Sequence, residues 1–318
     1  MFTVLVTAPT FATRGIELLE QGGCRVLYAK NEEEIARNLA TEPVDGVISR
    51  TLPLSGTAMA ACPTLKVISK HGAGYDNVDV AAATRLKIPV FYTPGANAQS
   101  VAELVFGLMV AVARSVTNHD RALRAGEWNR AGAGLQLSGR NLGVVGLGNV
   151  GRRVAKLGAA FGMTVTGYDP YIADAPCVMS DSLDSLLAGA QVLTLHVPLT
   201  DETRGMIGAR ELALLPADAI VINTARGGVV GEAALAEAIQ SRKLYGAGFD
   251  VFEAEPMRSG HLFHSLPCTV ITPHVGGSTG ASLEAVAIQC VVNVLTYLNR
   301  QLFDSSLCVN PDVLGVRG

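Results

Sequence analysis

Three polar residues in the second half of the chain could carry acid–base chemistry on a small anion. Arg226 follows the apolar run AIVIN, Glu255 lies in GFDVFEAEP, and His274 lies in TVITPHVGGS. An arginine can bind a carboxylate through two parallel hydrogen bonds. A histidine next to a carboxylate can take up and release a proton near neutral pH. Taken singly, each residue is more typical of a surface charge or a structural histidine, and their joint position at predicted strand ends is what favours a catalytic site.

A glycine motif upstream predicts a dinucleotide site. Gly146-x-Gly148-x-x-Gly151 stands between a predicted strand and a predicted helix, where glycines allow a tight turn and let a pyrophosphate approach the helix N-terminus. Asp169 ends the next predicted strand, 18 residues after Gly151, and would accept hydrogen bonds from the adenosine ribose. No Arg or Lys follows in YDPYIADAP, so the pattern favours NAD over NADP. The alternative, glycines that serve packing alone, is weakened by the acid. Beside a nicotinamide, the three polar residues would make a hydride-transfer site for a 2-oxo or 2-hydroxy acid.

The elements that would position these residues alternate along the whole chain. Short apolar, β-branched runs are separated by Ala-, Leu- and Glu-rich segments, which is typical of βαβ units and a parallel sheet. A long helix should begin at a capping box formed by Ser100 and Glu103, and a last helix should cover about 280–299. The expected strands are 2–7, 25–28, 45–49, 66–70, 88–92, 141–146, 163–169, 191–197, 219–223, 245–250 and 268–273.

Two domains are expected, because 318 residues exceed the size at which one hydrophobic core usually stops growing. The glycine motif lies mid-chain, after a complete α/β half. We therefore predict two doubly wound α/β domains with parallel sheets. A Rossmann NAD-binding domain at 96–285 would be inserted in a flavodoxin-like substrate (catalytic) domain made of 1–95 and 286–318.

Composition argues against several classes of protein. The net charge is −3 with no basic stretch, so nucleic acid is not an expected partner. The six cysteines are scattered without a CxxC pair, which favours reduced thiols over disulfides or a zinc site, and no metal is expected. The apolar run LVFGLMVAVA is about half the ~20 residues that a membrane span needs. A cytoplasmic protein that acts on a small molecule is the expectation.

Several motifs together resemble one enzyme family. The motifs that carry this resemblance are, in order, GLGNVGRRVA…YDP, HVPLTDETRGMI, INTARGGVV, GFDVFEAEP and PHVGGST. Through them the chain resembles the D-isomer-specific 2-hydroxyacid dehydrogenases, and within that family most of all the phosphoglycerate dehydrogenase branch. HGAGYDNVDV and NAQSVAELVFGLM extend the resemblance over nearly the whole chain. It implies that Arg226 holds the substrate, that His274 is the general acid/base and that Glu255 is its partner. It also implies a homodimer formed through the NAD-binding domain.

The same resemblance implies which residues contact each ligand. Those implied for the cofactor are Ala73, Gly146, Gly148, Asn149, Val150, Gly151, Asp169, His196, Val197, Pro198, Thr203, Thr224, Ala225, Arg226, Asp250, His274, Gly276 and Gly277. Those implied for the substrate are Arg50, Lys70, His71, Gly72, Ala73, Gly74, Asn97, Arg226 and His274. The loop from Lys70 to Asn77 would offer backbone N–H groups to the substrate carboxylate.

The substrate is the part that the sequence leaves open. Arg50 and Lys70 match positions that face a phosphate in phosphoglycerate dehydrogenases, and Arg130 matches one near the partner subunit's site. The resemblance thus favours 3-phosphoglycerate and 3-phosphohydroxypyruvate, in serine biosynthesis, in a short form without a C-terminal regulatory domain. His71 replaces an expected small residue, which keeps hydroxypyruvate and glyoxylate open as alternatives. An alternative of another class is an NAD-sensing, co-repressor-like binding protein, since such family members retain a similar triad.

Overall fold

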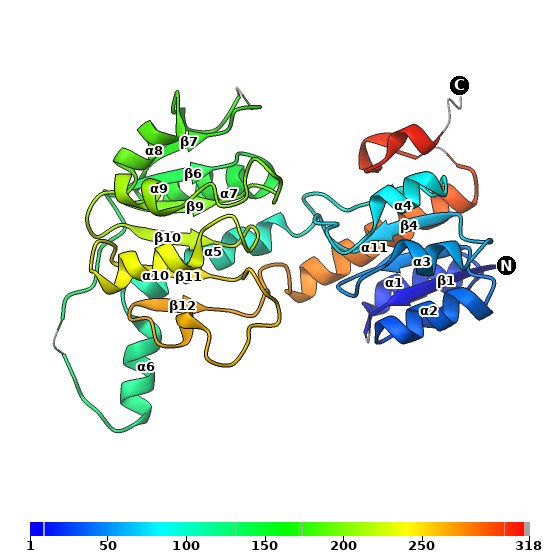
Figure 1. Cartoon of the computed structure of the whole chain (residues 1–318), viewed down its shortest axis with the longest axis horizontal. Helices are drawn as coiled ribbons and strands as arrows, with labels where there is room; N and C mark the ends of the chain where they lie inside the picture. Colours follow the sequence, from blue (N-terminus) through cyan, green and yellow to red (C-terminus); the bar gives the residue numbers. More distant parts are fainter. Residues whose placement is uncertain (9, 131, 173, 302, 315–318) are drawn as a thin grey trace. The chain divides into compact units, whose positions relative to one another are not determined.

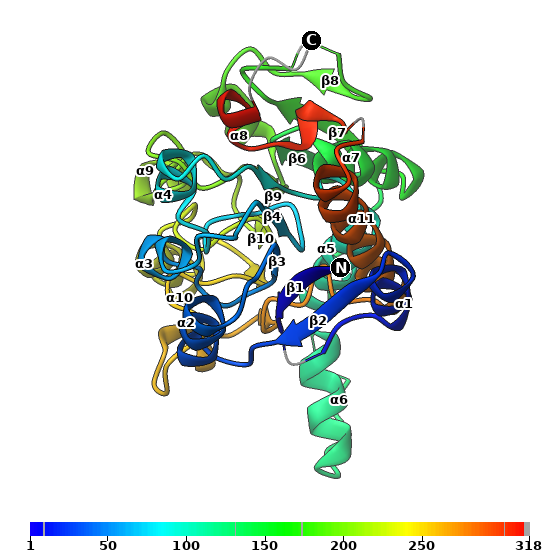
Figure 2. The ribbon, with the colours of Figure 1, turned by 90° about the vertical axis from the view of Figure 1, so that its right-hand side faces the viewer.

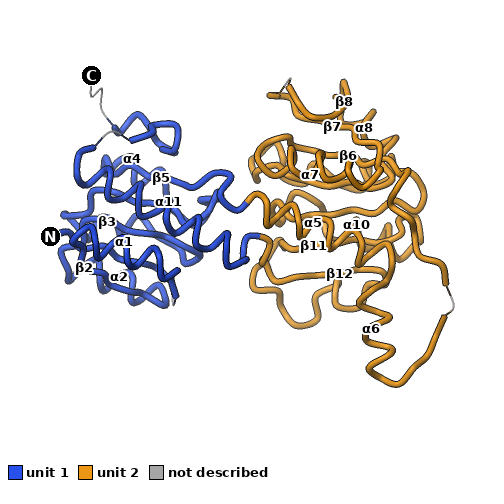
Figure 3. Tube along the Cα trace, turned by 180° about the vertical axis from the view of Figure 1, so that it is seen from behind, with its two compact units in different colours: residues 1–97, 277–318 blue, residues 98–276 orange. Residues whose placement is uncertain are grey.

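The computed structural model describes residues 1–8, 10–130, 132–172, 174–301 and 303–314, and the chain divides into two compact units (Figure 3). Unit 1 consists of Met1–Asn97 and Gly277–Gly318, and unit 2 is Ala98–Gly276. The second boundary therefore follows Gly276, whereas the sequence predicts it after residue 285. The reason is that helix α11 (Gly280–Leu298) packs as a whole against α1 (Thr13–Gln21) and the sheet of unit 1.

Unit 1 is built on a five-stranded sheet with the order β2-β1-β3-β4-β5, in which every pairing is parallel. This is the flavodoxin-like order, as predicted. Its strands are β1 (Phe2–Thr7), β2 (Cys24–Tyr28), β3 (Gly46–Ser49), β4 (Val67–Lys70) and β5 (Val90–Phe91). Its remaining helices are α2 (Glu32–Thr41), α3 (Gly56–Ala60), α4 (Val80–Arg85), η2 (Ser305–Leu307) and η3 (Pro311–Leu314).

Both faces of this sheet are covered by helices, as Figure 2 shows. Because neighbouring residues of a strand point to opposite faces, β1 supplies both layers of the core. Leu5 packs with residues of α2, α3 and α4, whereas Val4 and Val6 pack with residues of α1 and α11. Burial on both faces explains why the inner strands read as almost continuous apolar runs in the sequence.

Unit 2 has a seven-stranded sheet with the order β12-β11-β10-β9-β6-β7-β8, again parallel throughout (Figure 1). The strands are β6 (Asn141–Val145), β7 (Thr164–Tyr168), β8 (Val178–Met179), β9 (Val192–Leu195), β10 (Ile220–Asn223), β11 (Gly246–Phe249) and β12 (Thr269–Ile271). The helices are α5 (Ala98–Ala113), α6 (Val116–Arg124), α7 (Asn149–Ala160), α8 (Leu183–Gly189), α9 (Ala209–Leu214), α10 (Glu232–Gln240) and η1 (Leu262–His264). This is the Rossmann arrangement that the sequence predicts, and only the two-residue β8 was not expected.

The helices of unit 2 also divide between the two faces of its sheet. Buried residues of α8, α9 and α10 form one core cluster with the strands, and those of α5 and α7 form another. Helix α5 is apolar nearly all round, since nine of its residues are buried. The predicted capping box is wrong: α5 begins at Ala98, so Ser100 lies inside it, and Glu103 instead accepts a hydrogen bond from Gln99 at 2.9 Å.

The last helix, α11, covers the expected range and begins with a side-chain cap. Thr279 accepts a hydrogen bond from the N–H of Ser282, which satisfies one of the helix's free donors. By length and composition alone this helix could cross a membrane, as could α5 and α6 taken together across their 64° bend. Within unit 1, however, α11 packs on α1, β3 and β4, as a buried core helix does.

Candidate active site

The predicted site residues of unit 2 gather at one edge of its sheet. Since all strands are parallel, the segments that follow β6, β7, β9, β10, β11 and β12 leave from the same edge. The strand order reverses direction between β6 and β9, and open α/β sheets bind ligands outside the carboxyl ends of their strands at such a point. The glycine motif follows β6 directly, so it lies at that reversal.

The glycine motif needs its first and third glycines for the fold itself. Gly146 has φ +86°, and a Cβ there would lie 2.6 Å from the carbonyl oxygen of His196. A Cβ on Gly151 would lie 1.9 Å from the carbonyl oxygen of Gly146. No larger residue fits at either position, which lets α7 start tightly against the end of β6.

Asp169, at the end of β7, holds the same loop. Its carboxylate accepts the N–H of Leu147 through Oδ2 at 2.8 Å and the N–H of Tyr171 through Oδ1 at 3.0 Å. A carboxylate has about four lone-pair sites, so two backbone bonds leave acceptor capacity for ribose hydroxyls. The acid therefore fixes the glycine loop and has acceptor capacity left for the ribose contact, which stays a prediction.

Two observations show that this edge fits a dinucleotide. Gly148 is the N-cap of α7 with φ −71°, and a Cβ there would meet nothing within 4 Å. Neither packing nor backbone strain explains a glycine at that position, whereas a ligand approaching the helix N-terminus does. Thr224 follows β10, and its buried hydroxyl has no hydrogen-bond partner among the described residues. An unpaired buried hydroxyl is costly, and a bound polar ligand would satisfy it.

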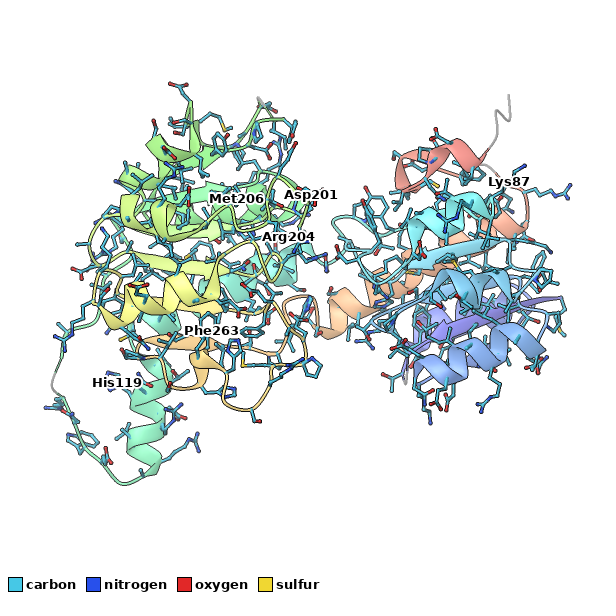
Figure 4. All side chains as sticks on the ribbon, in the orientation of Figure 1. Lys87, His119, Asp201, Arg204, Met206 and Phe263 are labelled. Atoms are coloured by element: carbon cyan, nitrogen blue, oxygen red, sulfur yellow. The ribbon has the colours of Figure 1, made fainter. Side chains whose placement is uncertain are left out.

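The segment after β9 is ordered by its own polar groups. His196 is half-buried, and desolvation lowers the pKa of its imidazole to about 3, so the ring is neutral when it bonds Thr194 Oγ1 at 2.9 Å. Thr203 Oγ1 donates to the carbonyl oxygen of Pro198 at 2.6 Å and closes the following turn. Figure 4 labels Asp201 and Arg204, two other residues of this turn.

The turn after β10 is held by a buried asparagine. Asn223, 1% exposed, accepts the N–H of Ala225 at 3.0 Å and donates to the carbonyl oxygen of Arg226 at 2.9 Å. Arg226 is half-buried, and its Nη1 donates to the carbonyl oxygen of Ala225 at 2.6 Å. Asn223 thus fixes the turn, and the guanidinium lies close to the backbone of the same turn.

Glu255 and His274 form a hydrogen-bonded pair, as predicted from the sequence. Glu255 Oε2 lies 2.7 Å from His274 Nδ1, and both side chains are partly exposed, at 35% and 52%. The hydrogen bond that His274 donates to Glu255 raises the pKa of His274 above its usual 6.5, against burial and the positive charge of Arg226. Burial raises the pKa of Glu255, but the hydrogen bonds from His274 and from the N–H of Phe252 outweigh it and hold that pKa below its usual value.

Asp250 fixes the loop that carries His274. Its Oδ1 accepts from Thr272 Oγ1 at 2.6 Å and from the N–H of Val275 at 2.9 Å, and its Oδ2 accepts from the N–H of Gly276 at 2.8 Å. His274 has φ +54°, an uncommon value for a residue other than glycine, and its N–H donates to the carbonyl oxygen of Asp250 at 2.8 Å. The predicted contact of Asp250 with the cofactor stays a prediction, since its carboxylate here serves the loop.

A cavity of about 270 Å³ opens beside the pair. Apart from Glu255 and His274 it is lined mainly by apolar side chains, including Phe252, Met257, Ile271 and Pro273. An apolar wall with two convergent polar groups is the usual composition of a small-molecule site.

The predicted substrate loop belongs to unit 1 and follows β4. Gly72 has φ +132°, donates its N–H to Thr93 Oγ1 at 3.0 Å and accepts from the N–H of Thr93 at 3.1 Å. The N–H groups of Ala73 and Gly74 make no hydrogen bond to the part of the chain that the structure describes. Adjacent free N–H groups are what an anion needs. Asn97 lies against Gly277, where a Cβ would be 2.8 Å from its Nδ2.

The two cations expected near a phosphate differ in their surroundings. Lys70 is only 6% exposed, and its ammonium donates to the carbonyl oxygen of Arg50. Arg50 is half-buried and its Nη1 lies 3.5 Å from the carbonyl oxygen of Thr10. Burial and the nearby charge of Arg50 lower the pKa of His71 to about 4, so the ring, which packs edge-on against Phe11, is neutral.

Comparison with known proteins shows which family the chain is similar to. Residues 106–276 match the model of the D-isomer specific 2-hydroxyacid dehydrogenase NAD-binding domain. D-3-phosphoglycerate dehydrogenase of Methanocaldococcus jannaschii is 38% identical over 312 residues, which cover 96% of this chain and 59% of that one. Hydroxypyruvate reductase of Thermotoga maritima is 40% identical over 79% of this chain and 84% of its own length.

The chain belongs to the D-isomer-specific 2-hydroxyacid dehydrogenase family. A crystal structure of NAD⁺-bound 3-phosphoglycerate dehydrogenase from Entamoeba histolytica is similar, with a TM-score of 0.84, 28% identity, and coverage of 97% of this chain and 98% of that one. Unit 2 is thus the NAD-binding domain, as predicted. This family member spans 59% of the length of its Methanocaldococcus relative.

Sequence reasoning missed several residues that hold the site of this dehydrogenase-family chain together. Asn223 carries a weak signal, because a polar residue ending an apolar strand is unusual, and it is the anchor of the Arg226 turn. Glu232 and His261, which are described below, carry none, since each is an ordinary residue of a helix or loop until the fold brings them together.

Replacing Gly148 with alanine should separate folding from cofactor binding. The new Cβ meets no protein atom, so the free energy of unfolding should change by no more than about 1 kcal/mol. NAD affinity should fall at least about tenfold, which is about 1.4 kcal/mol, because the methyl group occupies the approach to the helix N-terminus. Calorimetric NAD titration measures this, and Gly189→Ala, also in open space, is the control. Unchanged affinity in Gly148→Ala would contradict the placement.

Replacing Glu255 with glutamine should lower the pKa of His274, because the amide carries no charge to stabilise the imidazolium. Histidine ring NMR titration of both proteins measures the change, and the exposed Glu237→Gln is the control. The sign also applies to stability. Since the folded-state pKa of His274 is raised, its contribution is full below the unfolded-state pKa and is lost as the pH rises through the folded-state pKa. A His274 pKa that is the same in Glu255→Gln and wild type would refute this account.

Proposed function

We propose that this protein is an NAD-dependent dehydrogenase that interconverts a D-2-hydroxy acid and the corresponding 2-oxo acid. The observation that carries the proposal is the 2.7 Å hydrogen bond between Glu255 and His274. It lies at the carboxyl edge of the NAD-binding sheet, where Arg226 leaves the neighbouring strand β10. Acid–base pair, anion-binding cation and hydride carrier are the three components that this reaction needs.

We propose that one atom of His274 carries out the proton transfer. His274 Nδ1 faces Glu255, which leaves Nε2 as the nitrogen that meets the substrate oxygen. NAD, when bound, exchanges a hydride with C2 of the substrate. In reduction, protonated His274 gives its Nε2 proton to the oxo oxygen, and in oxidation Nε2 takes the hydroxyl proton. Glu255 keeps the ring oriented and favours its protonated form, which suits a general acid near neutral pH.

Arg226 is proposed to bind the substrate carboxylate and carbonyl. A guanidinium is planar and presents parallel N–H donors, so it fixes a carboxylate in orientation as well as position. The backbone carbonyl oxygen of Arg226 accepts a hydrogen bond from Asn223, so the side chain is attached to a fixed turn. In unit 1, the N–H groups of Ala73 and Gly74 are proposed to bind an anion.

For the substrate itself we propose 3-phosphoglycerate and 3-phosphohydroxypyruvate, with Arg50 as the phosphate ligand. Similarity to D-3-phosphoglycerate dehydrogenase over 96% of this chain supports it. A second candidate is reduction of hydroxypyruvate or glyoxylate. It is favoured by the burial of Lys70, whose ammonium is engaged by the carbonyl oxygen of Arg50 rather than exposed to a phosphate.

NADH oxidation with a panel of 2-oxo acids tests the substrate. The panel is phosphohydroxypyruvate, hydroxypyruvate, glyoxylate, pyruvate and 2-oxoglutarate, each with wild type and Arg50→Ala. The phosphorylated acid should be preferred, and Arg50→Ala should lower its kcat/KM by about 10–100-fold, the value of a charge-assisted hydrogen bond of about 1.5–3 kcal/mol. The control is Arg85→Ala, which changes an exposed arginine of the same unit.

Other outcomes of the panel identify the alternatives. Preference for an unphosphorylated acid, unaffected by Arg50→Ala, would overturn the phosphate assignment and favour the hydroxypyruvate or glyoxylate reductase. No turnover with any acid, together with NAD binding, would favour the co-repressor-like binding protein.

We also propose a homodimer that forms through unit 2. Helix α6 has no buried residue, and Leu123 and Trp128 are 55% and 76% exposed. The helix extends away from the sheet of its unit (Figure 1). A hollow of about 210 Å³ lies there, lined by His119, Leu123, Trp128 and their neighbours. Exposed apolar side chains around a hollow are typical of an interaction surface.

Light scattering after size-exclusion chromatography tests the dimer. Wild type should have twice the mass of one chain, and Leu123→Asp should shift it to the monomer, because a carboxylate would be buried without a partner. Glu237→Gln, at an exposed position of α10, should leave the mass unchanged. A dimeric Leu123→Asp protein would exclude α6 from the interface.

A further inference from the structure

A second carboxylate–histidine pair lies in unit 2, outside the acid–base pair described above. His261 Nε2 is 3.0 Å from Glu232 Oε2, and their side chains are only 17% and 7% exposed. Neither residue touches the groups assigned to the reaction. A buried carboxylate is retained only where its partners satisfy it, so the pair requires a reason.

Glu232 holds a peptide of the segment that follows β11. It is the first residue of α10, where the helix N-terminus favours a negative charge. Its Oε1 accepts the N–H of Glu253 at 2.8 Å, and the N–H of Glu232 in turn lies 3.5 Å from Glu253 Oε1. Helix α10 and the segment 250–256 are thus joined by reciprocal bonds between residues 21 apart in sequence.

His261 orients the Glu232 carboxylate from the other side. Its Nδ1 accepts the N–H of Phe263 at 3.3 Å, so the ring hydrogen lies on Nε2 and is donated to Glu232. The rings of Phe252 and Phe263 pack edge-on against the imidazole, with centroids 6.0 and 5.3 Å away. Phe263, labelled in Figure 4, comes from η1 between β11 and β12.

Phe252, whose carbonyl group belongs to the peptide held by Glu232, is in contact with both halves of the proposed catalytic apparatus. The N–H of Phe252 donates to Glu255 Oε1 at 2.9 Å, the oxygen that does not face His274. On the other side, a Cβ on Gly227 would lie 1.9 Å from the carbonyl oxygen of Phe252, so the turn that carries Arg226 is pressed directly onto this segment. A shift of the Phe252–Glu253 peptide would therefore move Glu255 and displace the turn next to Arg226.

We propose that Glu232, oriented by His261, is a positioning residue that fixes the Phe252–Glu253 peptide and through it the alignment of Glu255 with His274. As a statement about catalysis it rests on the proposed dehydrogenase function. The part of the proposal that concerns the positions of Glu255 and His274 does not depend on that function. Misplacement of a catalytic group by about 1 Å costs about 100-fold in rate, so a distant support of this kind is expected to be visible in kcat.

The test compares Glu232→Ala, Glu232→Gln and the control Glu237→Gln, an exposed residue of the same helix. Alanine removes both bonds of the carboxylate. Glutamine keeps an oxygen for the N–H of Glu253 but presents an NH₂ to His261 Nε2–H, so its effect should be smaller. With the best 2-oxo acid of the panel, Glu232→Ala should lower kcat by about 10–100-fold, with KM for NADH within about threefold. Glu237→Gln should match wild type.

A second readout needs no activity. In wild type the charged groups that act on His274 are Glu255, Asp250 and Arg226, and the hydrogen bond to Glu255 has the largest effect. If Glu232 aligns Glu255, the NMR-measured pKa of His274 should fall in Glu232→Ala, fall less in Glu232→Gln and stay unchanged in Glu237→Gln. Should Glu232→Ala fail to fold, Glu232→Gln and His261→Ala are measured instead.

The outcomes are distinct. A lower melting temperature with unchanged His274 pKa and unchanged kcat would show a merely structural pair and overturn the proposal. Absence of turnover in wild type would overturn the proposed function, while the titration would still decide whether Glu232 positions Glu255. A fall in the His274 pKa with Glu232→Ala, absent in the control, would support the proposal in either case.

Discussion

The carboxylate of Asp250 accepts three hydrogen bonds from the loop that carries His274, and the carboxyl edge of unit 2 is organised around that loop. At 1% exposure, Asp250 cannot exchange these donors for water, so the loop conformation and the buried charge stabilise each other. The left-handed backbone of His274 is maintained in this way. The fixed backbone places the imidazole of His274 within hydrogen-bonding distance of Glu255. Glu255 itself lies five residues after Asp250 in the sequence.

The two carboxylate–histidine pairs of unit 2 have the same chemical groups but differ in solvent exposure. Glu255 and His274 are partly exposed, so the imidazole keeps a ring nitrogen for a ligand. Glu232 and His261 are enclosed, and each of their hydrogen-bonding atoms meets protein, which suits support rather than turnover. The segment between β11 and η1 contacts both pairs, and the backbone of this segment therefore links the positions of the two pairs.

Much of this arrangement follows from patterns within short windows of sequence. Alternating apolar runs predict both parallel sheets, and Gly146, Gly148 and Gly151 with Asp169 predict the nucleotide edge, because strand, turn and helix signals are local. The partners of Asp250 and Glu232 are 20–30 residues away and are set by which strands become neighbours, so no local signal identifies them. The misplaced second boundary has the same origin, since apolar periodicity shows that α11 is buried but not which sheet it covers.

The insertion of unit 2 into unit 1 has a consequence for biosynthesis. The first strand of the unit 1 sheet begins at Phe2, but two parts that complete this unit are synthesised last. They are helix α11, which covers the sheet, and Asn310, whose side chain accepts the N–H of Val90 at 2.8 Å across 220 residues. On the ribosome, unit 2 is a continuous stretch whose residues all emerge before α11 does. Until then, the apolar face that includes Val4, Val6, Ile48 and Val67 can be covered by α1 but not by α11. The nascent chain thus carries an aggregation-prone surface for most of its synthesis, and chaperone binding to the first 97 residues would protect it.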